Sequence, residues 1–170
     1  NGLSVKKINS SSFEGHGFYA DSEGKSFCQK IEESSLFKKN EQRDNLLKIN
    51  NLYGHTCFLM EFAPNFSCEQ HIEINNLLSN QGPGVKQNRL LFLINPGANV
   101  KIIEQTIDLS SGSNFHNTVS EIICLKKSFL EHISIQKGFQ NNCSVKTSFI
   151  AQDKESQSNF YNISLNGKMI

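Results

Sequence analysis

The sequence lacks an excess of charge of either sign. Its 17 lysines and arginines nearly balance its 16 aspartates and glutamates, which leaves a formal net charge of +1. A chain with so little net charge has no broad basic field that would collect nucleic acid or an anionic membrane surface. We therefore expect neither nucleic acid nor a membrane among its partners.

The sequence also lacks a long apolar run and a targeting segment. No stretch approaches the roughly 18 apolar residues that a membrane-spanning helix requires. The chain begins at Asn1 without a charged-then-apolar signal segment, and it ends within a patterned region that includes Leu165 and Ile170. Both ends predict that these 170 residues are a piece of a longer protein.

The cysteines do not form a recognisable disulfide framework, because their number is odd and their spacing irregular. We predict free thiols and a cytoplasmic protein. Cys124 lies within an apolar run, where a reduced cysteine packs as a small hydrophobic residue. Cys143 lies in a polar stretch and is the candidate for an accessible thiol. The five cysteines are Cys28, Cys57, Cys68, Cys124 and Cys143.

Sequence motifs for common catalytic sites are absent. The glycine-containing loop around Gly82 and Lys86 does not match the phosphate-binding pattern G-x-x-x-x-G-K-[ST], and no G-x-S-x-G nucleophile elbow occurs. His116 and His132 have no recognisable serine or cysteine partner in the sequence. We therefore expect that the protein is not an enzyme.

One set of side chains has the chemistry of a metal site but not its usual spacing. His55, Cys57, Cys68 and His71 would supply the two thiols and two imidazoles that zinc takes tetrahedrally. The short loop between the two pairs matches no common zinc module, so we expect strand and turn residues without a metal. These four remain the candidate metal ligands if the chain holds one.

The N-terminal third of the chain differs in pattern from the rest. It starts with mixed polar and aromatic residues, which predict irregular structure with a short strand. A helix capped at Ser34 or its neighbour would run to Leu52, and Gly54 would end it. We divide the chain into an N-terminal segment of residues 1–54 with one helix and a β core of residues 55–170.

Within the β core, apolar and polar residues alternate with a period of two, which is typical of strands. Residues 90–94 do not alternate and predict a strand that is buried on both faces. Residues 75–88 predict a loop. Asn95-Pro96-Gly97 predicts a tight turn, because proline fixes φ and glycine permits a positive φ.

A weak internal repeat decides the expected fold. The stretch Val119–Gln136 predicts two short strands joined by a polar turn, and echoes of it recur at a spacing of thirty residues. One two-strand unit cannot bury its apolar face alone, whereas stacked units share a continuous core. We therefore predict a mainly β fold, a β-solenoid rather than a sandwich. The residues that keep step are Val100, Leu130 and Phe160; Ile103, Ile133 and Ile163; and Arg89, Val119 and Phe149.

Several segments, taken in order, resemble a known family. Thr118–Ile123 and Leu130–Gln136 are similar to the T-E-I…L-E-H…I-Q signature of the SufB/SufD family of iron–sulfur cluster assembly proteins, and favour its SufD branch over SufB. Arg89–Val100 resembles the family's strand–turn–strand start, and Leu165–Lys168 resembles its G-G-K segment. The resemblance covers about residues 45–170.

The resemblance implies a right-handed parallel β-helix that serves as a non-catalytic scaffold subunit in a complex of SufB, SufC and SufD. It implies no cofactor within these residues, and an iron–sulfur cluster handled transiently by the full complex. The family's contacts with a SufB-like homologue and a SufC-like ATPase lie beyond Ile170. The family often has proline at the position of His71, which weakens a family-wide metal role there. We also expect self-association through the open end of the truncated solenoid.

A second interpretation remains open at this point. Four Asn-x-Ser triplets match the glycosylation acceptor pattern, which would fit a secreted carbohydrate-active or adhesive β-helix protein. The chain is rich in Asn and Ser, so chance matches are also expected. The triplets begin at Asn9, Asn65, Asn142 and Asn162.

Overall fold

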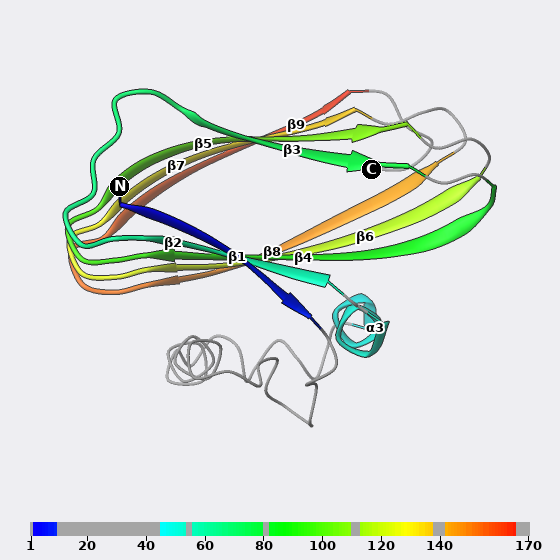
Figure 1. Ribbon diagram of the computed structural model, residues 1–170, viewed down its shortest axis with the longest axis horizontal. Coiled ribbons are helices and arrows are strands. Elements are labelled where there is room, and N and C mark those ends of the chain that lie inside the picture. The colour runs from blue at the N-terminus through cyan, green and yellow to red at the C-terminus, as the bar shows by residue number, and fades with distance from the viewer. Residues whose placement is uncertain are drawn as a thin grey trace.

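The chain forms one short helix and nine strands within the residues that the structure describes (Figure 1). The computed structural model describes residues 2–9, 45–53, 56–79, 82–109, 113–137 and 142–165. The elements are β1 (Leu3–Asn9), α3 (Asn45–Tyr53), β2 (Thr56–Phe62), β3 (Ile72–Leu78), β4 (Gly84–Ile94), β5 (Asn99–Asp108), β6 (Asn114–Cys124), β7 (Phe129–Lys137), β8 (Cys143–Gln152) and β9 (Gln157–Leu165). None of the described helical residues forms a segment long and apolar enough to cross a membrane.

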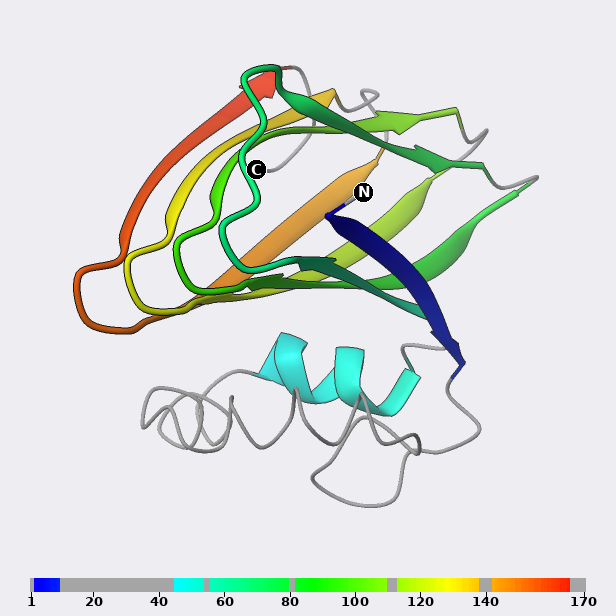
Figure 2. The ribbon, with the colours of Figure 1, turned by 60° about the vertical axis from the view of Figure 1, so that its left-hand side comes forward.

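The strands lie in two sheets that face each other. One is five-stranded with the order β1-β2-β4-β6-β8, and the other is four-stranded with the order β3-β5-β7-β9. From β2 onward, consecutive strands alternate between the sheets, and the neighbours within each sheet run parallel. The coils therefore stack as a parallel β-solenoid around a shared lumen (Figure 2), which confirms the predicted fold class.

The thirty-residue repeat is confirmed for one step and wrong for the next. Val100 pairs with Leu130 and Arg89 with Val119, each thirty residues apart. In the following coil Leu130 pairs with Ser158 and not with Phe160, because the spacing falls to 28. Counted between paired positions, the path from Lys137 to Cys143 is two residues shorter than the path from Ile107 to Phe115 in the preceding coil. A shift of two preserves which side chains point inward, so the fold tolerates it.

The turns between the sheets stack on one another at one end of the solenoid. Asn65, Gly97, Lys127 and Glu155 all adopt positive φ, between 56° and 71°. Each lies third in a four-residue turn closed by a backbone hydrogen bond of 3.0–3.2 Å. The Gly97 amide donates to the Lys126 carbonyl at 3.1 Å, and the Lys127 amide donates to the Lys154 carbonyl at 3.2 Å. The turn predicted at Asn95-Pro96-Gly97 is thus one of a stacked series.

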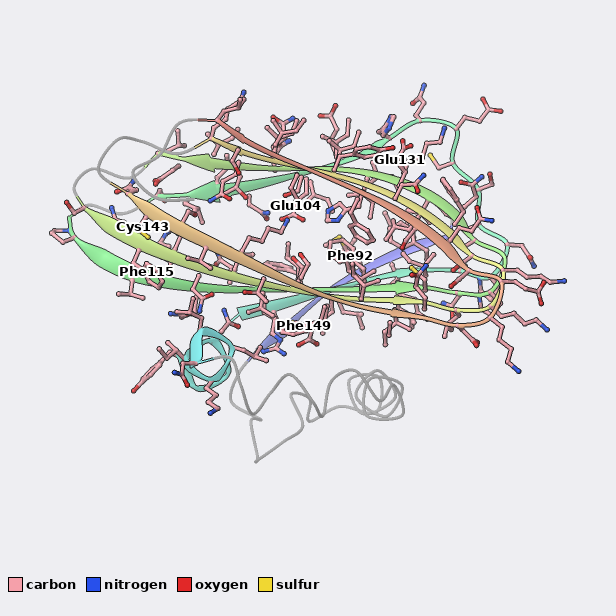
Figure 3. The ribbon with its side chains drawn as sticks, turned by 180° about the vertical axis from the view of Figure 1, so that it is seen from behind. Phe92, Glu104, Phe115, Glu131, Cys143 and Phe149 are labelled. Atoms are coloured by element: carbon pink, nitrogen blue, oxygen red, sulfur yellow. The ribbon has the colours of Figure 1, made fainter. Side chains whose placement is uncertain are left out.

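The lumen next to these turns is filled with apolar side chains. Phe92 is 1% exposed and lies between the two sheets (Figure 3). Alternation along each strand places every second residue inside, so neighbouring coils bring like side chains together. The buried cluster comprises Met60, Phe62, Leu90, Phe92, Ile94, Ala98, Val100, Ile102, Ile122, Cys124 and Leu130.

The outer face of the five-stranded sheet is also buried near α3. Leu47 and Asn50 of the helix are 1% and 0% exposed. The Asn50 amide donates to the Asn88 and Asn117 carbonyls, both at 3.0 Å, so it ties α3 to β4 and β6. Residues 90–94 are buried on both faces as predicted, because the lumen lies on one side and this outer layer on the other.

One expectation for a connecting segment needs revision. Residues 75–88 are not a loop: β3 reaches Leu78 and β4 begins at Gly84. Parallel pairing with β5 satisfies the backbone there and overrides the polar composition, and Asn76 finds a partner inside the lumen.

At the N-terminus, the predicted helix ends at Tyr53, close to Gly54, and its predicted cap at Ser34 lies outside the described residues. The expected short strand is β1, which pairs antiparallel with β2.

Candidate functional site

The lumen changes from apolar to polar along the strands, away from the stacked turns. On β5 the inward residues run from Val100 and Ile102 to Glu104 and Asp108, and all four are at most 3% exposed. On β7, buried Leu130 is likewise followed by inward-facing His132. Each strand therefore contributes both to the core and to a buried polar region. Burying such groups is costly unless they are paired and hydrogen-bonded.

Glu104 is the centre of the first polar cluster. Its side chain is completely buried and points between the sheets (Figure 3). Oε1 accepts a hydrogen bond from Asn76 Nδ2 at 3.0 Å, while Oε2 lies 3.0 Å from His132 Nε2 and 2.7 Å from Lys146 Nζ. Lys146 also donates to Ser134 Oγ at 2.8 Å. Because Lys146 comes from β8, this cluster joins the two sheets across the lumen.

Asp108 is the centre of the second cluster, closer to the ends of the strands. His116 Nε2 lies 3.1 Å from Asp108 Oδ2, and Asn142 Nδ2 donates to the same oxygen. The Asn142 side-chain oxygen accepts from the Asn114 amide at 2.9 Å. His116 Nδ1 is buried and has no hydrogen-bond partner among the described residues. This geometry favours the neutral tautomer that carries its proton on Nε2.

The two clusters differ in the charge of their titratable side chains, because Glu104 is ionised and His116 is neutral. For Glu104, burial would raise the pKa, but the His132 hydrogen bond and the Lys146 charge outweigh burial and leave the pKa below its usual value. For His116, burial lowers the pKa, and the opposing attraction of Asp108 is too weak to reverse that. Glu104 is therefore a buried carboxylate, and His116 a buried neutral imidazole.

These pKa directions predict that acid destabilises the fold. Below about pH 6.5 the unfolded chain protonates its histidines, whereas folded His116 resists protonation, so the unfolded state binds more protons and the free energy of unfolding falls. The slope from one group is at most about 1.4 kcal/mol per pH unit. Below pH 4.5, protonation of Glu104 removes further stability as the pH passes through its lowered pKa.

Denaturant titrations at pH 7.5, 6.5 and 5.5 measure this effect. His116→Gln should flatten the pH dependence in that range because it removes the titrating imidazole. An equal slope in the variant and the parent protein would contradict the assignment to His116.

The structure does not bring the three described candidate metal ligands, Cys57, Cys68 and His71, together. Cys57 lies on the outer face of the five-stranded sheet and is buried, while Cys68 lies in the turn segment before β3. His71 Nε2 lies 3.1 Å from Glu131 Oε1 beside the four-stranded sheet, and His55 lies outside the described residues. No cluster of three or more His, Cys, Asp or Glu side chains able to hold a metal occurs in the described part of the chain.

Cys68, Cys124 and Cys143 are free thiols in different surroundings. Cys124 is fully buried, and burial raises the pKa of its thiol to about 12, so it is the inert core residue that we expected. Cys143 is half-buried on β8 and remains the candidate accessible thiol. Asn142, the first residue of one glycosylation triplet, is 3% exposed and hydrogen-bonded, so the folded chain cannot present it to a glycan.

Sequence analysis missed Glu104 and Asp108 as the partners of His132 and His116. The available signal was the alternation of inward and outward residues: inward positions of β5 and β7 are even-numbered, and His132 follows buried Leu130 in such a row. Glu121 points away from the lumen, yet it is 2% exposed and forms a buried ion pair with Arg89. No local pattern around Glu121 indicates this burial.

The lumen opens at its last coil. A cavity of about 500 Å³ lies between β8 and β9 and is mostly lined by hydroxyl and amide side chains. Lys146 is its only basic lining residue among the described ones, and it is paired with Glu104. The lining also includes Ser134, Gln136, Ser144, Ser148, Asn162 and Ser164, with Ile150 and Phe160 toward the apolar core.

Residues 76–170 match the family model described as SUF system FeS cluster assembly, SufBD core domain, which is more than half of the chain. The chain belongs to the SufBD core family. The match starts in β3 and takes in both polar clusters and the open cavity, so these are features of a SufBD core. Membership of this family associates the protein with iron–sulfur cluster assembly in the SUF system. Searches of curated proteins and of solved structures return no match.

Proposed function

We propose that this SufBD core is a SufD-like, non-catalytic scaffold subunit for iron–sulfur cluster assembly. The family match across the solenoid carries the proposal. The state of the ionisable groups supports it: Glu104 accepts three hydrogen bonds, and Asp108 faces His116 and Asn142 within a closed cluster. Groups so fully engaged stabilise the lumen and are poorly placed to act on a substrate.

The proposed partners are a SufB-like homologue and a SufC-like ATPase, bound through regions beyond residue 170. In this proposal the iron–sulfur cluster is cargo of the complete complex, and residues 1–170 hold no cofactor. The SufD branch is favoured over SufB by the Leu130-Glu131-His132 motif. We further propose that the complex works in the cytoplasm, which agrees with the free thiols among the described cysteines.

Co-purification of the full-length protein under reducing conditions tests this function. We expect a homologous β-helix subunit and an ATPase to be retained through size-exclusion chromatography. The piece of residues 1–170 serves as the matched control and should not retain the ATPase. If the full-length protein bound neither partner, the proposal would be overturned.

We also propose that the open end of the solenoid mediates self-association of this piece. β8 and β9 are the last described strands of their sheets, and such edges pair readily with another chain. Ser148→Lys would place a charge at the mouth of the cavity, and inward-pointing charges block edge pairing. We expect this variant to sediment with a lower weight-average mass than the parent. Equal masses would count against the open end as an interface.

A further inference from the structure

The outer face of the four-stranded sheet carries an apolar surface that no described element covers. The five-stranded sheet has α3 against its outer face, whereas no described helix or strand lies against the outer side of β5, β7 and β9 (Figure 1). Tyr161, Ile163 and Leu165 are 52%, 43% and 46% exposed, and the neighbouring isoleucines are half-buried. Contiguous exposed apolar residues of this kind mark interaction sites.

We call this surface the β5–β7–β9 face. It consists of the outward-pointing residues of three neighbouring strands, which keep register with one another. They are Lys101, Ile103, Gln105 and Ile107 of β5; Glu131, Ile133, Ile135 and Lys137 of β7; and Asn159, Tyr161, Ile163 and Leu165 of β9.

The central strand of this face is self-complementary. Along β7 the outward residues read acidic, apolar, apolar, basic: Glu131, Ile133, Ile135, Lys137. Reversing the direction of the strand exchanges the acidic end for the basic end and leaves the apolar centre unchanged. A second β7 running antiparallel above it would therefore place Glu131 opposite Lys137, and Ile133 opposite Ile135.

We propose that two copies of this chain pack face to face through their β5–β7–β9 faces. The twofold axis would lie between the two faces, run across the strands, and pass over β7 between Ile133 and Ile135. A twofold axis requires the same patch on both copies, and this strand provides one. Stacked sheets lie about 10 Å apart and interdigitate their side chains. The occupant of the face is thus a second copy of the chain.

The flanking strands fit the same symmetry. β9 would lie over β9, with Tyr161 opposite Ile163, and β5 over β5, with Ile103 opposite Gln105. The apolar side chains then gather around the axis, while Lys137 and Glu131 lie farther out. His71, which lies 3.1 Å from Glu131, would remain at the rim. This surface is separate from the open end of the solenoid and goes beyond the proposed scaffold function.

Charge reversal on β7 gives a test that a different interface cannot imitate. The chain with Ser148→Lys is the background, so that association through the open end is suppressed. Glu131→Lys or Lys137→Glu alone should raise the dissociation constant roughly tenfold, because symmetry doubles each like-charge contact. The double variant should restore the parent value to within about threefold, since it only exchanges the partners.

Ile135→Lys tests the apolar centre. It should raise the dissociation constant at least about a hundredfold, because a charge would be buried at the axis twice. Sedimentation equilibrium measures the constants, and circular dichroism checks that each variant stays folded. A strictly monomeric background protein at the highest attainable concentration would overturn the proposal. So would an Ile135→Lys variant that dimerises normally, or a charge exchange that fails to restore dimerisation.

Discussion

Glu104→Gln is expected to lower the free energy of unfolding by about 3–5 kcal/mol, the range for breaking a buried ion pair by removing one partner. The carboxylate is completely buried and is the shared acceptor for Asn76, His132 and Lys146. The substitution keeps the size of the side chain but removes its charge, so the Lys146 ammonium, whose side chain is only 13% exposed, loses its counter-ion. Urea unfolding followed by far-ultraviolet circular dichroism measures the difference.

Glu73→Gln is the matched control, because Glu73 lies on the exposed outer side of β3. It should change the unfolding free energy by no more than about 0.5 kcal/mol. The double variant Glu104→Gln with Lys146→Gln should recover much of the lost stability, since it removes the stranded charge as well. If Glu104→Gln were as mild as Glu73→Gln, the cluster would not contribute to stability as we infer.

Phe92→Ala is expected to cost a similar amount, about 3–5 kcal/mol, because it opens a cavity at the centre of the lumen. Phe92 is 1% exposed, and its ring centroid lies 5.7 Å from that of His132, where the apolar core meets the first polar cluster. The coils above and below are fixed by backbone pairing and cannot collapse into the space. Chemical denaturation again provides the measurement.

Two comparisons make this prediction specific. Phe92→Leu retains most of the volume and should cost less than about 1.5 kcal/mol. Phe115→Ala removes a half-buried ring from the outer face of β6 and should cost clearly less than Phe92→Ala. Equal losses at the two phenylalanines would mean that the lumen is not the principal core.

Local pattern was sufficient to predict most of the strands. Alternation with a period of two identified the inward rows, and Asn95-Pro96-Gly97 marked a tight turn because its residues restrict φ. The unalternating run at residues 90–94 revealed burial on both faces. The second half of β3, residues 75–78, was misjudged as a loop, because its pairing with β5 depends on residues thirty positions away.

The buried polar clusters could not be predicted in this way. Glu104 finds its partners on β3, β7 and β8, between 28 and 42 residues away in the sequence. Those contacts depend on the distance between the sheets and on the change in coil length from thirty residues to 28. Glu121 likewise points away from the lumen, and only the tertiary structure shows that it is buried in an ion pair with Arg89.

By itself the sequence determined the stacked β architecture, the inward rows and the family. Backbone preferences, the alternation of inward and outward side chains along a strand, and the order of motifs are all local properties. Only the tertiary structure decided which polar residues meet inside the lumen, which candidate metal ligands stay apart, and which outer face is left uncovered. Side chains on opposite sheets are distant in the chain, so their pairing is set by how the coils stack.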